Sequence, residues 1–169
     1  MKRSLIVGGS LLVLCSVVPL AQTPATAKYP EIGVWKQNLE KSKYITGQPA
    51  RMSVRKYETT ADGFIVVTIA GLDSQGNPTF NMGRFKYDGK DYPVYPNTAL
   101  LAFVATGAKL ATNAYKIVDA YTGEFTSKDN TGKVTGTNTR VVSRDGKTLT
   151  ATAKDATGKV TNVLVFDRQ

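Results

Sequence analysis

The chain has 169 residues and a formal net charge of +9, with one cysteine and no histidine. Histidine is the commonest metal ligand and general base, so its absence excludes zinc sites and Ser-His or Cys-His nucleophile systems in their ordinary forms. The lysines and arginines are spread along the sequence without the runs that mark nucleic-acid sites, so we expect no nucleic-acid partner. Two readings of the charge stay open, namely weak contact with anionic envelope components and simple solubility.

The N-terminus has the pattern of a secretory signal peptide. Met1–Arg3 is positively charged, Ser4–Ala21 is apolar without a charged residue, and Ala25–Ala27 offers the small residues that a signal peptidase accepts. A retained membrane helix is the alternative, but the uninterrupted apolar part is short for the roughly 20 residues of a spanning helix. We therefore expect residues 1–27 to be removed before Lys28. The mature protein would be secreted or periplasmic, without a transmembrane segment.

The mature chain is predicted to be one domain. Residues 28–169 have a length typical of a single domain, enough to bury a core without disulfides. The only cysteine, Cys15, lies inside the signal peptide, and Leu14 before it is not the small residue that a lipid anchor requires. We expect no disulfide, no cysteine metal ligand and no cofactor in the mature protein.

Turn signals punctuate the mature chain at regular intervals. They are Asp62–Gly63, Asp73–Gly76, Asp88–Gly89, Asp129–Gly132, Asp145–Gly146 and Asp155–Gly158. Gly supplies the positive φ that hairpin turns need, and Asp accepts hydrogen bonds from the amides that follow it. Runs rich in Val, Ile, Thr, Phe and Tyr lie between the turns and predict strands. The predicted strands are Gly33–Leu39, Arg51–Thr59, Phe64–Leu72, Thr79–Tyr87, Tyr92–Val94, Ala99–Thr106, Ala114–Thr122, Lys133–Val142, Thr148–Lys154 and Val160–Phe166.

This spacing predicts an all-β fold. Strands about ten residues apart and joined by hairpin turns form an antiparallel up-and-down meander. A meander of about eight to ten strands must close on itself or split into two packed sheets. A closed barrel removes exposed sheet edges, so we predict the barrel, with a β-sandwich as the alternative.

The C-terminal third contains a near-repeat, with Asp129–Thr135 matching Asp155–Thr161. A calcium loop would need several carboxylates at alternating positions, whereas each copy has one. We interpret the near-repeat as the same type of hairpin turn used twice in one sheet.

Several segments resemble known barrel families. Gly33-Val34-Trp35 stands where lipocalins carry their Gly-x-Trp signature, and Val163–Arg168 closes the chain as a last strand. Trp35–Tyr44, Tyr87–Val94 and Ser143–Thr150 are similar to segments of small exported lipocalin-like bacterial proteins of unassigned function. The resemblance covers nearly all of the mature chain and implies a lipocalin-like barrel. Fold alone does not define a ligand.

The chain departs from two related patterns. Lipocalins place a helix after the barrel, whereas this sequence ends at the last predicted strand. Fatty-acid-binding barrels insert two helices after the first strand, whereas Glu40–Ala50 contains Gly47 and Pro49.

Trp35 and Gly33 are assigned structural roles. A lone Trp at the base of a barrel is usually a core plug covered by a long side chain. The resemblance implies that an arginine from a late strand packs over this indole, and Arg140 and Arg168 are the candidates.

Arg140 is also the predicted anchor for a ligand. A carboxylate inside an apolar barrel needs a charged partner, and Arg offers two parallel donors. Alternation places Arg84 and Lys86 on one face of their strand, which we expect to face solvent, and Phe85 and Tyr87 on the other.

Aromatic residues complete the candidate lumen. We expect Tyr57, Tyr115 and Tyr121 to supply hydroxyl groups, and Phe80, Phe103 and Phe125 to supply apolar wall; the alternative is an ordinary filled core.

The acidic residues give no catalytic pair. They fall mostly in turns, where capping accounts for them, and Glu124 and Asp119 have no recognisable partner. No catalytic residue and no metal site are therefore assigned. The leading hypothesis is a non-catalytic binding protein for a small apolar or amphipathic, fatty-acid-like ligand. Alternatives are an envelope-associated structural barrel without a ligand cavity, and a histidine-free enzyme that uses the barrel mouth.

Overall fold

The computed structural model describes residues 29–96 and 105–169. Ten strands make up this part of the chain. They are β1 (Gly33–Tyr44), β2 (Met52–Thr59), β3 (Ile65–Leu72), β4 (Pro78–Phe85), β5 (Asp91–Pro96), β6 (Thr112–Asp119), β7 (Thr122–Lys128), β8 (Val134–Val142), β9 (Thr148–Asp155) and β10 (Val160–Arg168). The predicted signal peptide, Cys15, Phe103 and most of the predicted strand Ala99–Thr106 lie outside the described residues.

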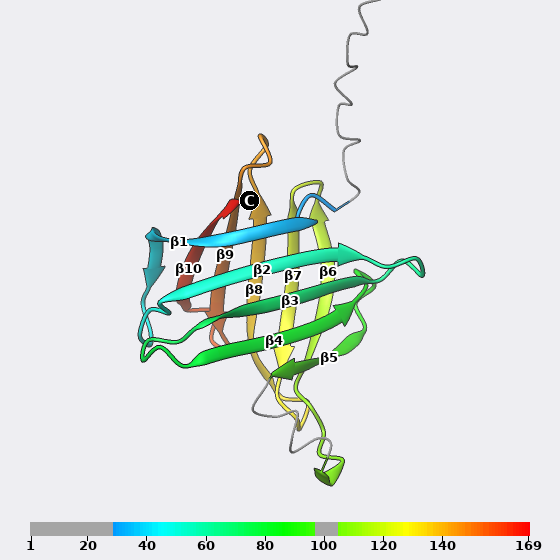
Figure 1. The fold of residues 1–169 in the computed structure, drawn as a ribbon. Coiled ribbons are helices and arrows are strands. Elements are labelled where there is room, and N and C mark those ends of the chain that lie inside the picture. The colour runs from blue at the N-terminus through cyan, green and yellow to red at the C-terminus, as the bar shows by residue number, and fades with distance from the viewer. Residues whose placement is uncertain (1–28, 97–104) are drawn as a thin grey trace, which may run out of the picture.

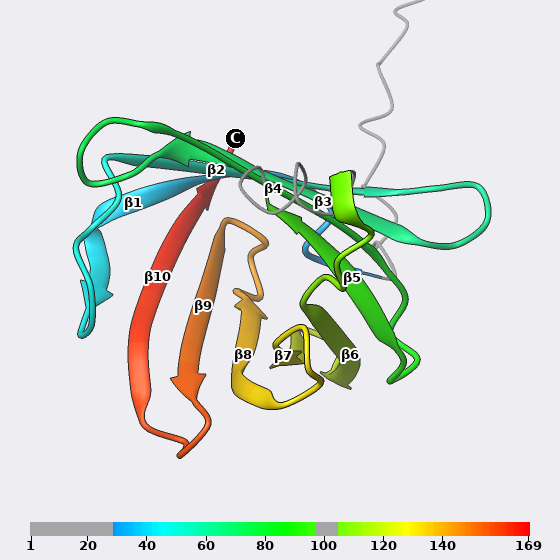
Figure 2. The same ribbon diagram turned by 90° about the horizontal axis from the view of Figure 1, so that it is seen from below.

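The strands form one closed antiparallel barrel, so the barrel prediction is confirmed and the sandwich alternative is wrong. Each strand pairs with the next along the chain, and β1 closes the sheet by pairing with β10. In Figure 1, β1 to β4 cross in front of the steeper β6 to β9. Figure 2 shows β10, β9, β8, β7 and β6 following one another beneath the layer of β1 to β4. Among the described residues, no helix is long and apolar enough to cross a membrane.

One predicted strand is wrong, because a turn divides it. The sequence predicts a strand over Ala114–Thr122, whereas β6 ends at Asp119 and β7 begins at Thr122. The Asp119 carboxylate accepts a hydrogen bond from the amide of Tyr121 at 2.8 Å and so stabilises a tight turn. This turn contains neither Gly nor Pro, and Val118 and Tyr121 are strand-forming residue types, so the sequence signal for it is weak.

The near-repeat is one turn used twice, as predicted. Asp129 accepts hydrogen bonds from the amides of Thr131 and Lys133, and Asp155 accepts them from the equivalent amides. The glycine of each turn has positive φ, 89° and 87°. Hydrogen bonds from the threonine hydroxyls are the largest influence that holds the pKa of Asp129 and Asp155 below 3.8. Each carboxylate thus stabilises its turn in the ionised form.

Trp35 plugs the end of the barrel at which the chain enters β1 and leaves β10, here called the closed end. Its side chain is fully buried, and its indole Nε1 donates to the carbonyl of Glu31 at 2.7 Å. The guanidinium of Arg168, rather than Arg140, covers the indole at 4.1 Å from the ring centroid. Arg168 also donates to the carbonyls of Ile32 and Pro30, at 2.8 and 2.7 Å. The plug therefore fastens the turn before β1 to the last strand.

Gly33 is required by the same plug. Its φ is +132°, which residues with a side chain rarely adopt, and a Cβ built there would lie 2.6 Å from Nη1 of Arg168. The Gly-x-Trp pattern thus has a local physical cause, because the arginine that covers the tryptophan also lies against the glycine.

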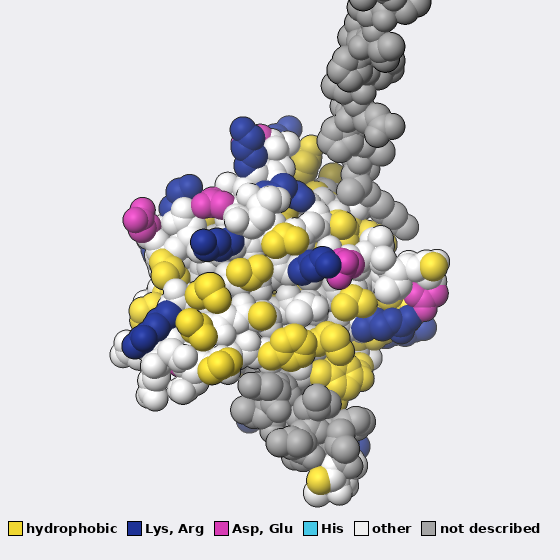
Figure 3. All heavy atoms as spheres, in the orientation of Figure 1, with side chains coloured by type: hydrophobic (Ala, Val, Ile, Leu, Met, Phe, Trp, Pro, Cys, Tyr) yellow, Lys and Arg dark blue, Asp and Glu magenta, His cyan; other side chains and the backbone are white. Residues whose placement is uncertain are grey.

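Strand alternation places the side chains of β4 on two faces. Phe85 is buried and Arg84 is exposed, as predicted. Phe80, predicted as lumen wall, is 41% exposed on the outer face, because it alternates with the inward positions of Asn81 and Gly83. The outer face over β1 to β4 carries hydrophobic side chains among Lys and Arg (Figure 3).

Candidate functional site

The barrel interior changes in character along its axis. Next to the Trp35 plug, the inward side chains are hydrophobic and fully buried; they are Ile65, Phe85, Leu149 and Phe166. Arg140 and several aromatic rings form the middle level. Beyond it, toward what we call the open end, the inward side chains are mostly polar and only half-buried, including Asn81, Asn113, Ser127, Asn138 and Asn162. These polar side chains at the open end keep part of their exposure to solvent.

Arg140 points inward from β8 and is 4% exposed. Its guanidinium carbon lies 5.3–5.5 Å from the ring centroids of Tyr57, Phe85, Tyr115 and Phe125. Its Nη2 donates to the hydroxyl of Tyr87 at 3.1 Å, while its Nε is buried and unpaired within the described part of the chain. Burial opposes the charge, but the surrounding tyrosines and Glu31 raise the pKa of Arg140 above its ordinary value. The guanidinium is therefore charged and has an unused donor.

A buried carboxylate from outside the strands completes this network. Glu31, in the turn before β1, is 5% exposed and accepts a hydrogen bond from the hydroxyl of Tyr87. Burial, together with the charge of Glu31, outweighs the influence of Arg140 and raises the pKa of Tyr87. The Tyr87 hydroxyl consequently stays protonated, so it can donate to Glu31 while it accepts from Arg140. Strand alternation places Tyr87 inward, but no sequence pattern indicates Glu31.

Arg55 brings a second guanidinium into the lumen, and the sequence interpretation missed it. Its guanidinium carbon lies 4.3 Å from the ring centroid of Phe166, and its Nε is buried with no partner among the described residues. Burial tends to raise the pKa of Tyr57, but the charges of Arg140 and Arg55 outweigh it and lower that pKa. The alternation of Arg55 with Tyr57 on β2 was the available signal for an inward side chain.

The middle level thus carries an excess of positive charge. Arg140 reaches one carboxylate, that of Glu31, through Tyr87, whereas Arg55 acts on Tyr57 together with Arg140. Beside them, Asn138 has a buried side-chain oxygen that is unpaired in the described structure. Buried donors and acceptors without partners are costly, so these groups are suited to a ligand or to ordered water.

A separate cavity of about 350 Å³ lies at the closed end. The turn before β1 forms one wall, the β6–β7 hairpin forms another, and Arg140 and Val142 of β8 form its floor. Its aromatic lining residues are Tyr29, Tyr87 and Tyr121. The volume falls in the range of small-molecule sites, roughly 300–1,000 Å³.

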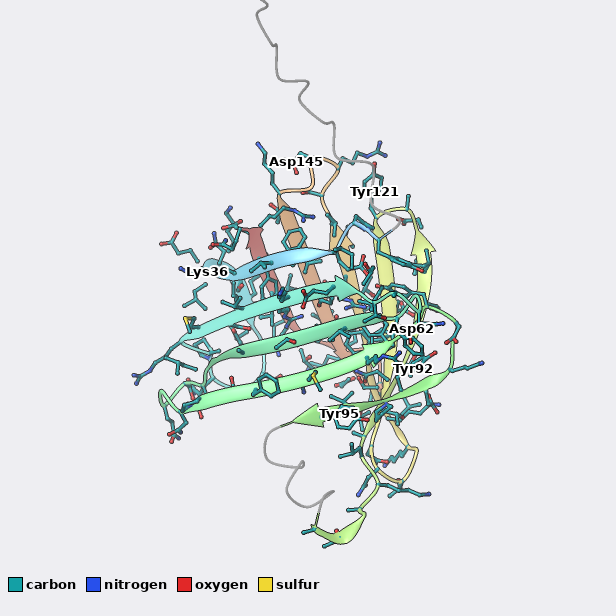
Figure 4. All side chains as sticks on the ribbon, turned by 45° about the vertical axis from the view of Figure 1, so that its right-hand side comes forward. Lys36, Asp62, Tyr92, Tyr95, Tyr121 and Asp145 are labelled. Carbon is teal, nitrogen blue, oxygen red and sulfur yellow. The ribbon has the colours of Figure 1, made fainter. Side chains whose placement is uncertain are left out.

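The predicted site residues are distributed between these two places. Tyr57 and Tyr115 pack around Arg140, as a lumen lining requires. The prediction that Tyr121 lines the lumen from a strand is wrong, because it stands in the β6–β7 turn, is 40% exposed and lines the closed-end cavity. Figure 4 shows it at the same end of the barrel as Asp145. Phe103 lies outside the described residues.

Gly123 makes room for the network. A Cβ built on this residue would lie 2.7 Å from the Tyr87 hydroxyl oxygen and 3.1 Å from the Cε1 atom of that ring. Its backbone is not in the left-handed region, so the restriction comes from the neighbouring side chain alone. The absence of a side chain at Gly123 therefore allows Tyr87 to reach both Arg140 and Glu31.

Comparison with known proteins gives likenesses in fold. No protein-family model matches the chain, and no curated protein matches it in sequence. A redesigned β-barrel, mFAP1, bound to DFHBI, is 12% identical with a TM-score of 0.42, over 85% of this chain and 100% of its own. A biogenic amine-binding protein is 12% identical with a TM-score of 0.45, over 92% of this chain and 72% of its own. The tryptamine complex of the amine-binding protein of Rhodnius prolixus is 13% identical with a TM-score of 0.44, over 92% and 71%.

Proposed function

We propose that this protein is a non-catalytic carrier, exported from the cell, whose barrel holds a small amphipathic molecule with an acidic head group. The head group meets Arg140 and Arg55 in the middle of the lumen, and the apolar body lies against the aromatic rings around Arg140. The observation that carries the proposal is a pair of inward guanidinium groups beside Tyr57, each with an Nε that is buried and unpaired among the described residues.

Electrostatics favours an acid over a neutral ligand. A buried charge that lacks a counter-ion is strongly unfavourable, and Glu31 supplies one negative charge against two positive ones. A carboxylate bound between Arg55 and Arg140 would balance the charge and accept the unused hydrogen bonds. We expect such a molecule to enter between the half-buried carboxamides toward the open end, such as Asn138 and Asn113.

The converging ionisable groups support binding better than catalysis. A general base must hold an available lone pair at the operating pH. The raised pKa of Tyr87 keeps that hydroxyl protonated, so it offers no basic oxygen. The proposal of export rests on the charged and apolar pattern of residues 1–27.

A thermal-shift comparison of decanoate with methyl decanoate tests the proposal. We expect decanoate to stabilise the wild-type protein more than its ester does. Arg55→Met should weaken decanoate binding by about 1.5–3 kcal/mol, the scale of a hydrogen bond to a charged group, with little effect on the ester. Arg140→Met should have the same effect on binding and also lower stability, because it leaves Tyr87 and Glu31 without their cation.

Arg84→Met is the matched control, since Arg84 points outward from β4 and pairs with Asp62 on the surface. Equal binding of acid and ester, or an equal loss in the Arg84 control, would overturn the proposed function.

A further inference from the structure

The closed-end cavity has walls of a different character from the lumen. Tyr29 and Tyr87 contribute neighbouring rings whose centroids are 5.4 Å apart, and Tyr121 contributes a third ring from the hairpin. Ile117 and Val142 add apolar surface between them. Aromatic rings with intervening aliphatic groups bind a compact apolar body, and the ring faces also attract cations.

Two carboxylates and one guanidinium carry charge among the described lining residues of this cavity. Glu31 lines the cavity and is only 5% exposed. Its Oε1 accepts a hydrogen bond from the Tyr87 hydroxyl. Its Oε2 has no hydrogen bond among the described residues. Asp119 lines the cavity from the end of β6. Within residues 29–96 and 105–169, Arg140 is the only cation that lines the cavity. Its guanidinium is directed into the ring cluster of the lumen and to Tyr87.

One further cation lies near the mouth. The guanidinium of Arg144 is 5.8 Å from the ring centroid of Tyr121, but Arg144 is exposed and is not a lining residue. Solvent screens an exposed charge much more than a buried one. The buried carboxylate of Glu31 is therefore the stronger influence on a ligand inside the cavity.

We propose that this cavity is a second ligand site, which takes a primary ammonium group carried on a small aromatic body. The ammonium would meet the unused oxygen of Glu31, and the aromatic body would lie among Tyr29, Tyr87 and Tyr121. This site shares Arg140 with the proposed acid site, because Arg140 forms the floor of the cavity. The ammonium would contact Glu31 rather than Arg140, so the proposal does not require an acid to bind in the lumen.

Calorimetric titration with three probes of one shape tests the proposal. The probes are 2-phenylethylamine, the neutral 2-phenylethanol and the anionic 3-phenylpropionate. We expect the amine to bind the wild-type protein roughly tenfold or more tightly than the alcohol, which corresponds to about 1.4 kcal/mol. Equal affinities for amine and alcohol, or no binding of the amine, would overturn the proposal.

Glu31→Gln removes the charge but keeps a side-chain oxygen that can accept from Tyr87. It should abolish most of the preference for the amine. Glu58→Gln is the matched control, because it removes the same charge from a solvent-exposed pair with Lys56 on the outer face. If both variants change amine binding equally, the effect is one of net charge and the proposal is wrong.

Tyr121→Leu is a second variant that tests the site if Glu31→Gln does not fold. The residue stands exposed in a turn, so we expect the variant to fold and to bind the amine several-fold more weakly because an aromatic face is lost. Unchanged amine binding in this variant would contradict the site. Arg55→Met separates the two proposals, since it should weaken decanoate and leave 2-phenylethylamine binding intact.

Discussion

Replacing Gly123 by Ala tests the buried network through a single added methyl group. The new Cβ would lie 2.7 Å from the Tyr87 hydroxyl oxygen, with two ring carbons at 3.1 and 3.2 Å. Tyr87 is packed against Tyr29, Phe85 and Tyr115, so its ring has little freedom to retreat. The methyl group should therefore push the hydroxyl away from Arg140 and Glu31.

The expected magnitude follows from three contributions. Overpacking costs about 1–3 kcal/mol, and loss of a hydrogen bond to a charged group costs about 1.5–3 kcal/mol. Ala in place of Gly in a strand offsets about 0.5–1 kcal/mol, because the unfolded chain loses freedom. We expect the free energy of unfolding to fall by about 2–4 kcal/mol, measured by urea denaturation.

Gly83→Ala, at a buried inward position of β4, is the matched control. Its Cβ would meet Val67 at 3.4 Å, an ordinary contact, so the free energy of unfolding should change by less than about 1 kcal/mol. In a Tyr87→Phe background the nearest clashing atom is absent, and Gly123→Ala should cost less than it does alone. Equal effects of the two glycine variants, or full additivity with Tyr87→Phe, would refute the reasoning.

Two further predictions concern the scaffold. Trp35→Ala should lower the free energy of unfolding by about 3–5 kcal/mol, the range for truncating a large core aromatic, and an unchanged denaturant midpoint would disprove the plug role. The pKa of Asp129 and Asp155 is lowered below 3.8 in the folded state, so their contribution to stability is present above that pH and is lost as the pH falls through the folded pKa. Melting temperatures followed from pH 7 to acid should therefore fall less steeply in the double variant Asp129→Asn, Asp155→Asn than in the wild-type protein.

Local chemistry made much of the barrel predictable. Turns that contain Asp and Gly are easily recognised in the sequence. Asp accepts hydrogen bonds from backbone amides and Gly adopts positive φ, as at Asp129 and Gly132. The β6–β7 turn gives a weaker signal. Asp119 forms hydrogen bonds with Tyr121 and Thr122 there, but the residues around it suit a strand equally well.

The residues of the candidate site were predictable only inside strands, where side chains alternate between the two faces of the sheet. Arg140 and Tyr57 lie inside strands, where the period of two decides the face of the sheet. Arg55 obeys the same rule and could have been found from Tyr57, two residues further on. Glu31 could not be found in this way, because it reaches the network from a turn that is held by the nearby Trp35 and by Arg168, which is distant in sequence. Which arginine covers Trp35 likewise depends on the pairing of β1 with β10.

The most direct test of the central claim is native mass spectrometry of the protein isolated from the cells that make it and from their medium. A ligand held by Arg140 and Arg55 should appear as a bound small acid, and Arg55→Met isolated in the same way should have lost it. An occupant that is neutral, or an acid retained at the same occupancy by Arg55→Met, would contradict the proposal that these two guanidinium groups form the binding site.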